Sequence, residues 1–190
     1  MQHPPALNSI RDYFTARSDA MLAELREFVE RETPSRDAAS IEGFIQDYSS
    51  RLEEAGLSCR QFAGPWGPQL LAELPGEEPP IVLLGHCDTV WPAGSVSERP
   101  PREEEGRLYG PGVYDMKAGL CIVLATARFL QESGAARRRK LQIIIAADEG
   151  VRPQTREHLD ICELLGVRTG GIVMTKTDLV EPDWLELVIE

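Results

Sequence analysis

Several common features are missing from this 190-residue chain, and each absence limits what the protein can do. No apolar run approaches the ~20 residues that a membrane-spanning helix needs. The N-terminus has no basic stretch followed by an apolar one, so no secretory signal is visible. The four cysteines stand apart, and none forms the Cys-x-x-Cys pair of zinc knuckles and redox sites. These absences predict a cytoplasmic protein that does not enter a membrane.

Positive charge is also scarce. Twenty Lys and Arg residues stand against 31 Asp and Glu residues, which gives a formal net charge of −11. Nucleic acid binding needs a basic face. The only basic cluster, residues 137–140, lies between a helical and a strand pattern and is typical of a solvated loop. We therefore expect no nucleic acid partner, and the sequence does not indicate an oligomeric state.

Apolar residues follow helical and strand periodicities in turn. Helical spacing predicts helices over residues 8–32, 38–55 and 120–130, with Ser35 or Asp37 as the cap of the second. Strand patterns occupy residues 57–62, 69–74, 81–85 and 141–147. The run at 81–85 is continuously apolar, as expected for a strand that is covered on both faces. This order predicts an α/β fold with a mostly parallel sheet and helices on both faces.

Residues that can perform chemistry follow these strand patterns. His86 and Asp88 come directly after one apolar strand, and Glu149 comes directly after another. Asp115 lies in a Gly-rich loop at the start of a helix. In α/β sheets, ligands bind beyond the carboxyl ends of the parallel strands. We therefore expect these four side chains to meet at one edge of the sheet.

The residue types fit a metal site. A neutral imidazole binds zinc, and a carboxylate on its other nitrogen fixes the tautomer, so His86 and Asp88 could form such a pair. The carboxylate of Asp115 could bridge two cations, and Glu149 could take a proton from a water that a metal makes acidic. Taken singly, Asp115 is equally well a helix cap and Glu149 part of a solvated turn. The conjunction of all four favours the metal-site interpretation.

Three stretches of the sequence resemble a known enzyme family. They are GHCDTVWPAG, GRLYGPGVYDMKAGL and IIIAADE, and their order and spacing are similar to those of the co-catalytic zinc peptidases. That family includes glutamate carboxypeptidase, aminoacylase and the succinyl-diaminopimelate desuccinylase type. The resemblance covers about residues 8–149. It implies an incomplete zinc-peptidase catalytic domain that hydrolyses a peptide or N-acyl amide bond next to a free carboxylate, in a small peptide or N-acyl amino acid.

The resemblance also implies residue roles. His86 would ligate one zinc, Asp115 would bridge the two zincs of the family's site, Asp88 would orient His86, and Glu149 would be the general base. It further implies a cis peptide bond after Asp115. The chain departs from the family at Gly150, where a second glutamate binds the other zinc, and it lacks the family's later Asp and His motifs. We therefore expect at most one weakly bound zinc and no activity from this chain alone.

The last part of the chain resembles a different family. Residues 146–190 are similar to the GTPase domain of the selenocysteine-specific elongation factor, with Thr175 to Asp178 in the place of its guanine-reading motif. The alternative function is therefore that of a guanine-nucleotide-binding elongation-factor fragment. The sequence has no Gly-x-x-x-x-Gly-Lys-Ser/Thr loop to hold phosphates, which weighs against it. We predict a chimera, with residues 1–149 from a zinc peptidase catalytic domain and residues 150–190 from a GTPase domain.

Overall fold

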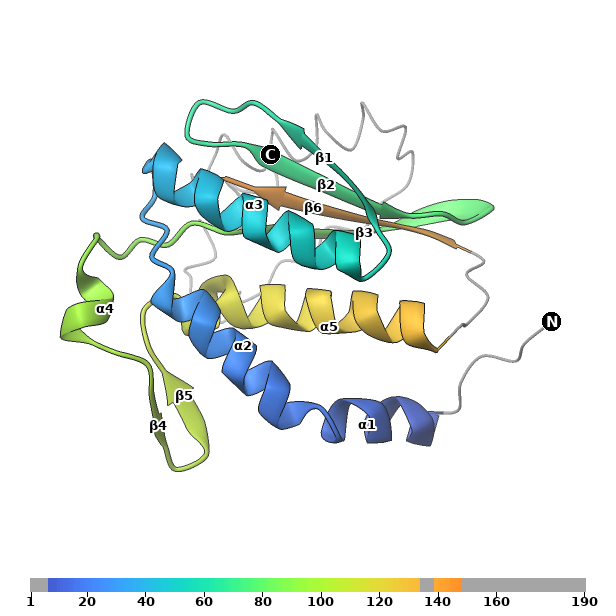
Figure 1. Cartoon of the computed structure of the whole chain (residues 1–190), viewed down its shortest axis with the longest axis horizontal. Coiled ribbons are helices and arrows are strands. Elements are labelled where there is room, and N and C mark those ends of the chain that lie inside the picture. Colours follow the sequence, from blue (N-terminus) through green and yellow to red (C-terminus); the bar gives the residue numbers. More distant parts are fainter. Residues whose placement is uncertain (1–6, 134–138, 148–190) are drawn as a thin grey trace, which may run out of the picture.

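The structure, a computed structural model, describes residues 7–133 and 139–147 (Figure 1). Its helices are α1 (Leu7–Thr15), α2 (Ser18–Glu30), α3 (Ala38–Glu54), the short α4 (Ser95–Glu98) and α5 (Ala118–Glu132). Its strands are β1 (Ser58–Phe62), β2 (Gln69–Leu74), β3 (Glu78–His86), β4 (Arg102–Glu104), β5 (Arg107–Tyr109) and β6 (Arg139–Ala146). An irregular helical turn, Val113–Lys117, precedes α5. Among the described residues, no helix has the length and apolar character to cross a membrane.

The main sheet has the strand order β1-β2-β6-β3. Strands β3 and β6 run parallel, whereas β1 pairs with β2, and β2 with β6, in antiparallel fashion. The predicted α/β class is confirmed, although the described sheet is mixed. Six residues join β1 to β2, which is enough for a hairpin but too short for a parallel crossover. The parallel β3–β6 pair brings the carboxyl ends of two strands to one edge.

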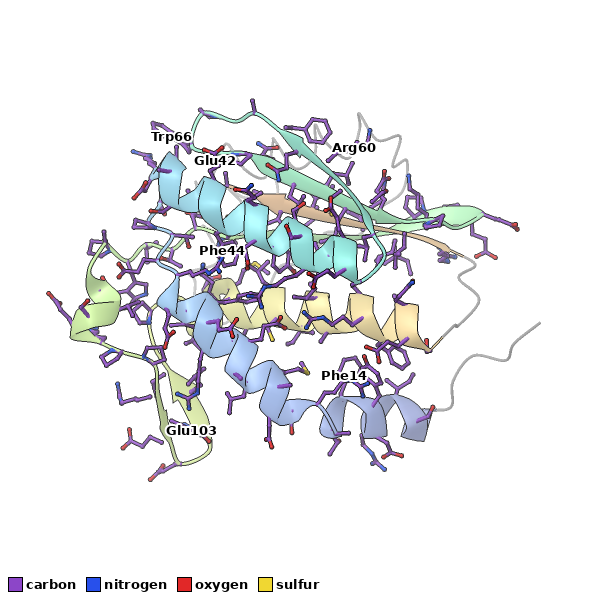
Figure 2. The ribbon with its side chains drawn as sticks, in the orientation of Figure 1. Phe14, Glu42, Phe44, Arg60, Trp66 and Glu103 are labelled. Carbon is purple, nitrogen blue, oxygen red and sulfur yellow. The ribbon has the colours of Figure 1, made fainter. Side chains whose placement is uncertain are left out.

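One side of the sheet carries α3 and α5, with α2 packed beside them (Figure 1). The core between these layers is apolar and fully buried, and it includes Phe28, Phe44, Ile45, Tyr48, Leu52, Leu70, Leu74, Leu120, Leu124, Ile143 and Ile145. Phe44 lies on the side of α3 that faces the other helices, with its ring 5.5 Å from that of Phe28 on α2 (Figure 2). The Tyr48 hydroxyl donates a hydrogen bond to the Leu120 carbonyl at 2.9 Å, which ties α3 to α5.

Strand β3 is less covered than its apolar sequence predicts. Ile81 and Leu84 are 49% and 46% exposed, so the expectation of cover on both faces is wrong for the described part of the chain. In that part, β3 is the edge strand of the sheet.

The single helix predicted over residues 8–32 is wrong, because the chain forms two helices there. Arg17 leaves the helical conformation, with φ −110° and ψ 5°. Its guanidinium lies 3.7 Å from the centre of the Tyr13 ring and 2.8 Å from the Glu132 carboxylate on α5. The break lets Tyr13 pack edge-on against Phe129. The helix predicted over 38–55 is confirmed as α3, and its cap is Asp37, which accepts a hydrogen bond from the Ser40 amide.

Candidate metal centre

The site forms where β3 ends. Its last residue, His86, lies opposite Ala146 of β6, and the next amide, that of Cys87, still donates to the Ala146 carbonyl at 3.1 Å. The His86 amide donates to the Met116 sulfur at 3.3 Å. Gly85 permits this approach, because a Cβ there would lie 3.0 Å from the Met116 methyl group. The sheet thus fixes the backbone that presents the imidazole.

Both nitrogens of the His86 ring face carboxylates. Nδ1 lies 3.1 Å from Asp88 Oδ1 and 3.2 Å from the Asp88 carbonyl oxygen. A carbonyl oxygen can only accept a hydrogen bond, so this contact favours the tautomer with a proton on Nδ1. Nε2 lies 3.2 Å from Asp115 Oδ1. A cation, either a proton or a metal ion, therefore fits between Nε2 and Asp115.

The two carboxylates differ in exposure. The Asp88 side chain is 1% exposed, whereas that of Asp115 is 56% exposed. Asp88 therefore supports the ring from inside the protein, and Asp115 faces solvent. This division matches the usual arrangement of a metal-binding histidine, whose second nitrogen donates to a buried acceptor.

Asp115 reaches the site from the irregular turn before α5. The Asp115–Met116 peptide bond is cis, as the family resemblance implies. Three residues before Asp115, at Gly112, φ is +71°, and a Cβ would lie 2.5 Å from Thr89 Cγ2. Glycine is therefore required on two counts, since an L side chain would be strained there and would collide with the residue after Asp88.

The fourth predicted residue, Glu149, lies outside the described residues, as does Gly150. Of the predicted residues that the structure describes, it brings His86, Asp88 and Asp115 together. Within the described ranges, no group of three or more His, Cys, Asp or Glu residues could hold a metal ion. Cys87, between the histidine and the aspartate, is buried, and burial raises the pKa of its thiol to about 12. It therefore stays a protonated core residue.

A segment that the sequence analysis did not assign to the site runs beside the end of β3. Ser35 Oγ lies 2.5 Å from Asp88 Oδ2, and the Ser35 amide donates to the Thr89 carbonyl at 2.9 Å. The Thr33 hydroxyl donates to the Cys87 carbonyl at 2.6 Å, and the Thr89 amide donates to the Thr33 carbonyl at 2.8 Å. We call Thr33–Pro34–Ser35 the clamp segment. It holds the backbone on both sides of Asp88.

Lys117 forms a buried hydrogen bond with the clamp segment. Its side chain is almost wholly buried, and its Nζ donates to Thr33 Oγ1 at 2.8 Å and lies 3.8 Å from the centre of the Phe44 ring. Burial lowers the pKa of Lys117 to about 8, against the attraction of Asp88, which raises it. The Thr33 hydroxyl thus accepts from Lys117 and donates to Cys87, which completes a buried chain of hydrogen bonds.

A pocket of about 210 Å³ opens beside Asp115. Its walls include the apolar side chains of Val90, Trp91, Val113 and Tyr114. Val90 and Tyr114 are both 82% exposed. The exposed carboxylate of Asp115 therefore borders a mostly apolar hollow with room for a small organic group.

Comparison with known proteins agrees with this geometry. Residues 82–174 match peptidase family M20/M25/M40, a span that includes His86, Asp88 and Asp115. These residues, which we call the M20 segment, are similar to peptidase family M20. The M20 match continues past Gly150, so the boundary between residues 149 and 150 stays a prediction.

Curated relatives of the M20 segment are hydrolases. The chain is 26% identical to carboxypeptidase G2 of Pseudomonas sp. (strain RS-16) over 139 residues, which is 71% of this chain and 34% of that protein. It is 34% identical to succinyl-diaminopimelate desuccinylase of Methylorubrum extorquens (strain PA1) over 117 residues, 56% of this chain and 30% of that enzyme. The chain thus spans about a third of the length of these M20 relatives.

Solved structures show the same fold. Human carnosine dipeptidase 1 superposes with a TM-score of 0.71 at 21% identity, over 87% of this chain and 39% of that one. A di-peptidase from Saccharomyces cerevisiae superposes with a TM-score of 0.63 at 16% identity, over 84% of this chain and 38% of that one. These likenesses confirm the α/β fold class.

A second relative supports the predicted chimera. The chain is 53% identical to the selenocysteine-specific elongation factor of Desulfomicrobium baculatum over 78 residues, which is 40% of this chain and 12% of that factor. The matched length is greater than the stretch 146–190 that sequence analysis assigned to this family. The two resemblances are thus both present in one chain.

Proposed function

We propose that the M20 segment belongs to the N-terminal, metal-binding part of a zinc-dependent hydrolase. This hydrolase would cleave peptide or N-acyl amide bonds next to a free carboxylate. The observation that carries this proposal is the His86 ring between a buried and an exposed carboxylate. Such a ring keeps its proton on Nδ1 and offers Nε2 to a cation. The names of the M20 relatives, a carboxypeptidase and a desuccinylase, support hydrolysis of this bond type.

The donor atoms fit zinc. Imidazole nitrogen and carboxylate oxygen are both common zinc ligands, and His86 Nε2 and Asp115 Oδ1 already face each other at 3.2 Å. Zinc held there would supply Lewis acidity toward the carbonyl of the substrate. Asp88 would keep the ring oriented, and Glu149, which lies outside the described residues, is the proposed general base.

Two ligands are too few for tight binding. Catalytic zinc usually has three protein ligands, and the glutamate that would serve a second zinc is replaced by Gly150. We therefore propose that this chain binds at most one zinc, weakly, and has no activity alone. The pocket beside Asp115 supports a small peptide or N-acyl amino acid with an apolar side chain as the ligand class of the complete enzyme.

Zinc titration against a chromophoric chelator tests this proposal on the purified chain. We expect one weak zinc for the wild type and at least tenfold weaker binding for His86→Ala and for Asp115→Ala. Hydrolysis of N-acyl amino acids and C-terminal peptide bonds should be no faster for the wild type than for Asp115→Ala. Zinc binding that survives both substitutions would place the metal elsewhere. Two tightly bound zincs, or hydrolysis abolished by Asp115→Ala, would show that other residues complete the site.

A further inference from the structure

We propose that Ser35 is a positioning residue that holds the Asp88 carboxylate and thereby sets which nitrogen of His86 carries the proton. This inference deepens the proposed function and rests on it for the role of His86. Ser35 comes from the loop between α2 and α3, 53 residues before Asp88 in the sequence. Its role is not that of the helix cap, because Asp37 caps α3.

The backbone fixes where the Ser35 hydroxyl lies. Pro34 and Thr89 form a parallel bridge, and the hydrogen bonds from the Ser35 amide to Thr89 and from the Thr89 amide to Thr33 flank it. This pairing holds the Ser35 backbone beside Asp88, so Oγ can leave the carboxylate only by rotation of the side chain. The hydroxyl also lies 3.1 Å from the Thr89 carbonyl, but its single proton goes preferentially to the nearer and charged Asp88 Oδ2, at 2.5 Å.

This bond restricts rotation of the Asp88 carboxylate. Oδ2 is held by Ser35, so Oδ1 is left facing His86 Nδ1 at 3.1 Å. Asp88 is 1% exposed, and water therefore has little access to replace a lost donor. Without Ser35, the Asp88 carboxylate could rotate, and its hydrogen bond with His86 Nδ1 would weaken.

The proton would then be drawn to the other side of the ring. Nε2 faces the Asp115 carboxylate, which also accepts hydrogen bonds. The Asp88 carboxylate and carbonyl on one side, and the Asp115 carboxylate on the other, thus compete for the proton of a neutral ring. By orienting the Asp88 carboxylate, Ser35 favours the proton on Nδ1. A proton on Nδ1 leaves the lone pair of Nε2 available for a metal ion, whereas a proton on Nε2 blocks it.

The chain contains a matched control. Ser40 Oγ donates to Asp37 Oδ2 at 2.9 Å, so it makes the same type of bond as Ser35. It lies at the start of α3, where its hydroxyl bonds Asp37, the cap of that helix. Ser40→Ala therefore removes a serine–aspartate hydrogen bond close by in sequence without acting on the imidazole.

The tautomer of His86 provides a readout that needs no metal and no activity. In chain labelled with ¹⁵N-histidine, long-range ¹H–¹⁵N spectra at pH 8 distinguish protonated from unprotonated ring nitrogens, and His86→Gln assigns the signal. We expect mainly Nδ1–H in the wild type and in Ser40→Ala. The ratio of Nδ1–H to Nε2–H should fall at least threefold in Ser35→Ala and return toward the wild-type value in Ser35→Thr.

Zinc affinity is the second readout. Ser35→Ala should weaken zinc binding about tenfold, whereas Ser35→Thr and Ser40→Ala should stay within about twofold of the wild type. If Ser35→Ala does not fold, Ser35→Cys, a weaker donor of similar size, should show an intermediate ratio. A wild-type ring protonated mainly on Nε2, or a folded Ser35→Ala with the wild-type ratio, overturns the proposal. Failure of the wild type to bind zinc refutes the proposed function but leaves the tautomer result as the test of Ser35.

Discussion

Glu24→Gln should destabilise the fold by about 2–3 kcal/mol, because Glu24 joins three of the helices that support the site. The Glu24 side chain on α2 is 9% exposed. It accepts hydrogen bonds from Arg51 on α3 at 2.9 Å and from both terminal nitrogens of Arg128 on α5 at 2.8 and 2.9 Å. An exposed ion pair contributes only ~0–1 kcal/mol, whereas removing one partner of a buried pair costs ~3–5 kcal/mol. Arg51 and Arg128 are partly exposed and can regain water, so the expected cost lies between these limits.

Urea unfolding, followed by circular dichroism, measures this cost, and an exposed pair provides the control. Arg17 and Glu132 make a 2.8 Å ion pair, but their side chains are 44% and 48% exposed. Glu132→Gln should therefore change the free energy of unfolding by less than about 0.5 kcal/mol. If Glu24→Gln costs no more than Glu132→Gln, burial does not set the strength of the helix-joining network and the reasoning is wrong.

Further expectations concern the turn at the site and the buried thiols. Gly112→Ala should lower the free energy of unfolding by at least ~1 kcal/mol more than Gly106→Ala. Both glycines have φ near +70°, but of the two only Gly112 would bring a Cβ against another residue. Equal losses of stability in urea unfolding would argue against the contact with Thr89. Burial raises the pKa of the Cys121 thiol to about 11, so between pH 9 and 11 the unfolded thiol loses its proton while the folded one keeps it. Stability should therefore decline as pH rises through this window, and Cys121→Ala should make the decline shallower; an unchanged slope in the variant would exclude the thiol as its source.

The sequence predicts those parts of the fold that depend on local periodicity. The strand expected at 69–74 and the helix expected at 38–55 match β2 and α3 closely. A short apolar run beside a Gly-Pro turn and a 3.6-residue apolar spacing are both properties of the segment itself. The break at Arg17 was not predictable from spacing, since it depends on contacts with α5. The antiparallel pairing of β2 with β6 depends likewise on a strand far along the chain.

The same distinction applies to the site. His86, Asp88 and Asp115 were expected near one another because each follows or opens a regular element at the same sheet edge. Ser35 and Lys117 were not, because their bonds span 53 residues to Asp88 and 84 residues to Thr33, and no local pattern encodes such a contact. Lys117 does lie within a stretch that carries the family resemblance, which was the available signal for it.

We propose that His86 and Asp115 bind one cation between them, and zinc-edge anomalous diffraction from crystals soaked with zinc would locate it. We expect one partly occupied zinc peak, within bonding distance of His86 Nε2 and an Asp115 carboxylate oxygen, with Asp88 still bound to Nδ1. A zinc peak bound at Nδ1, or one that touches neither His86 nor Asp115, would contradict it.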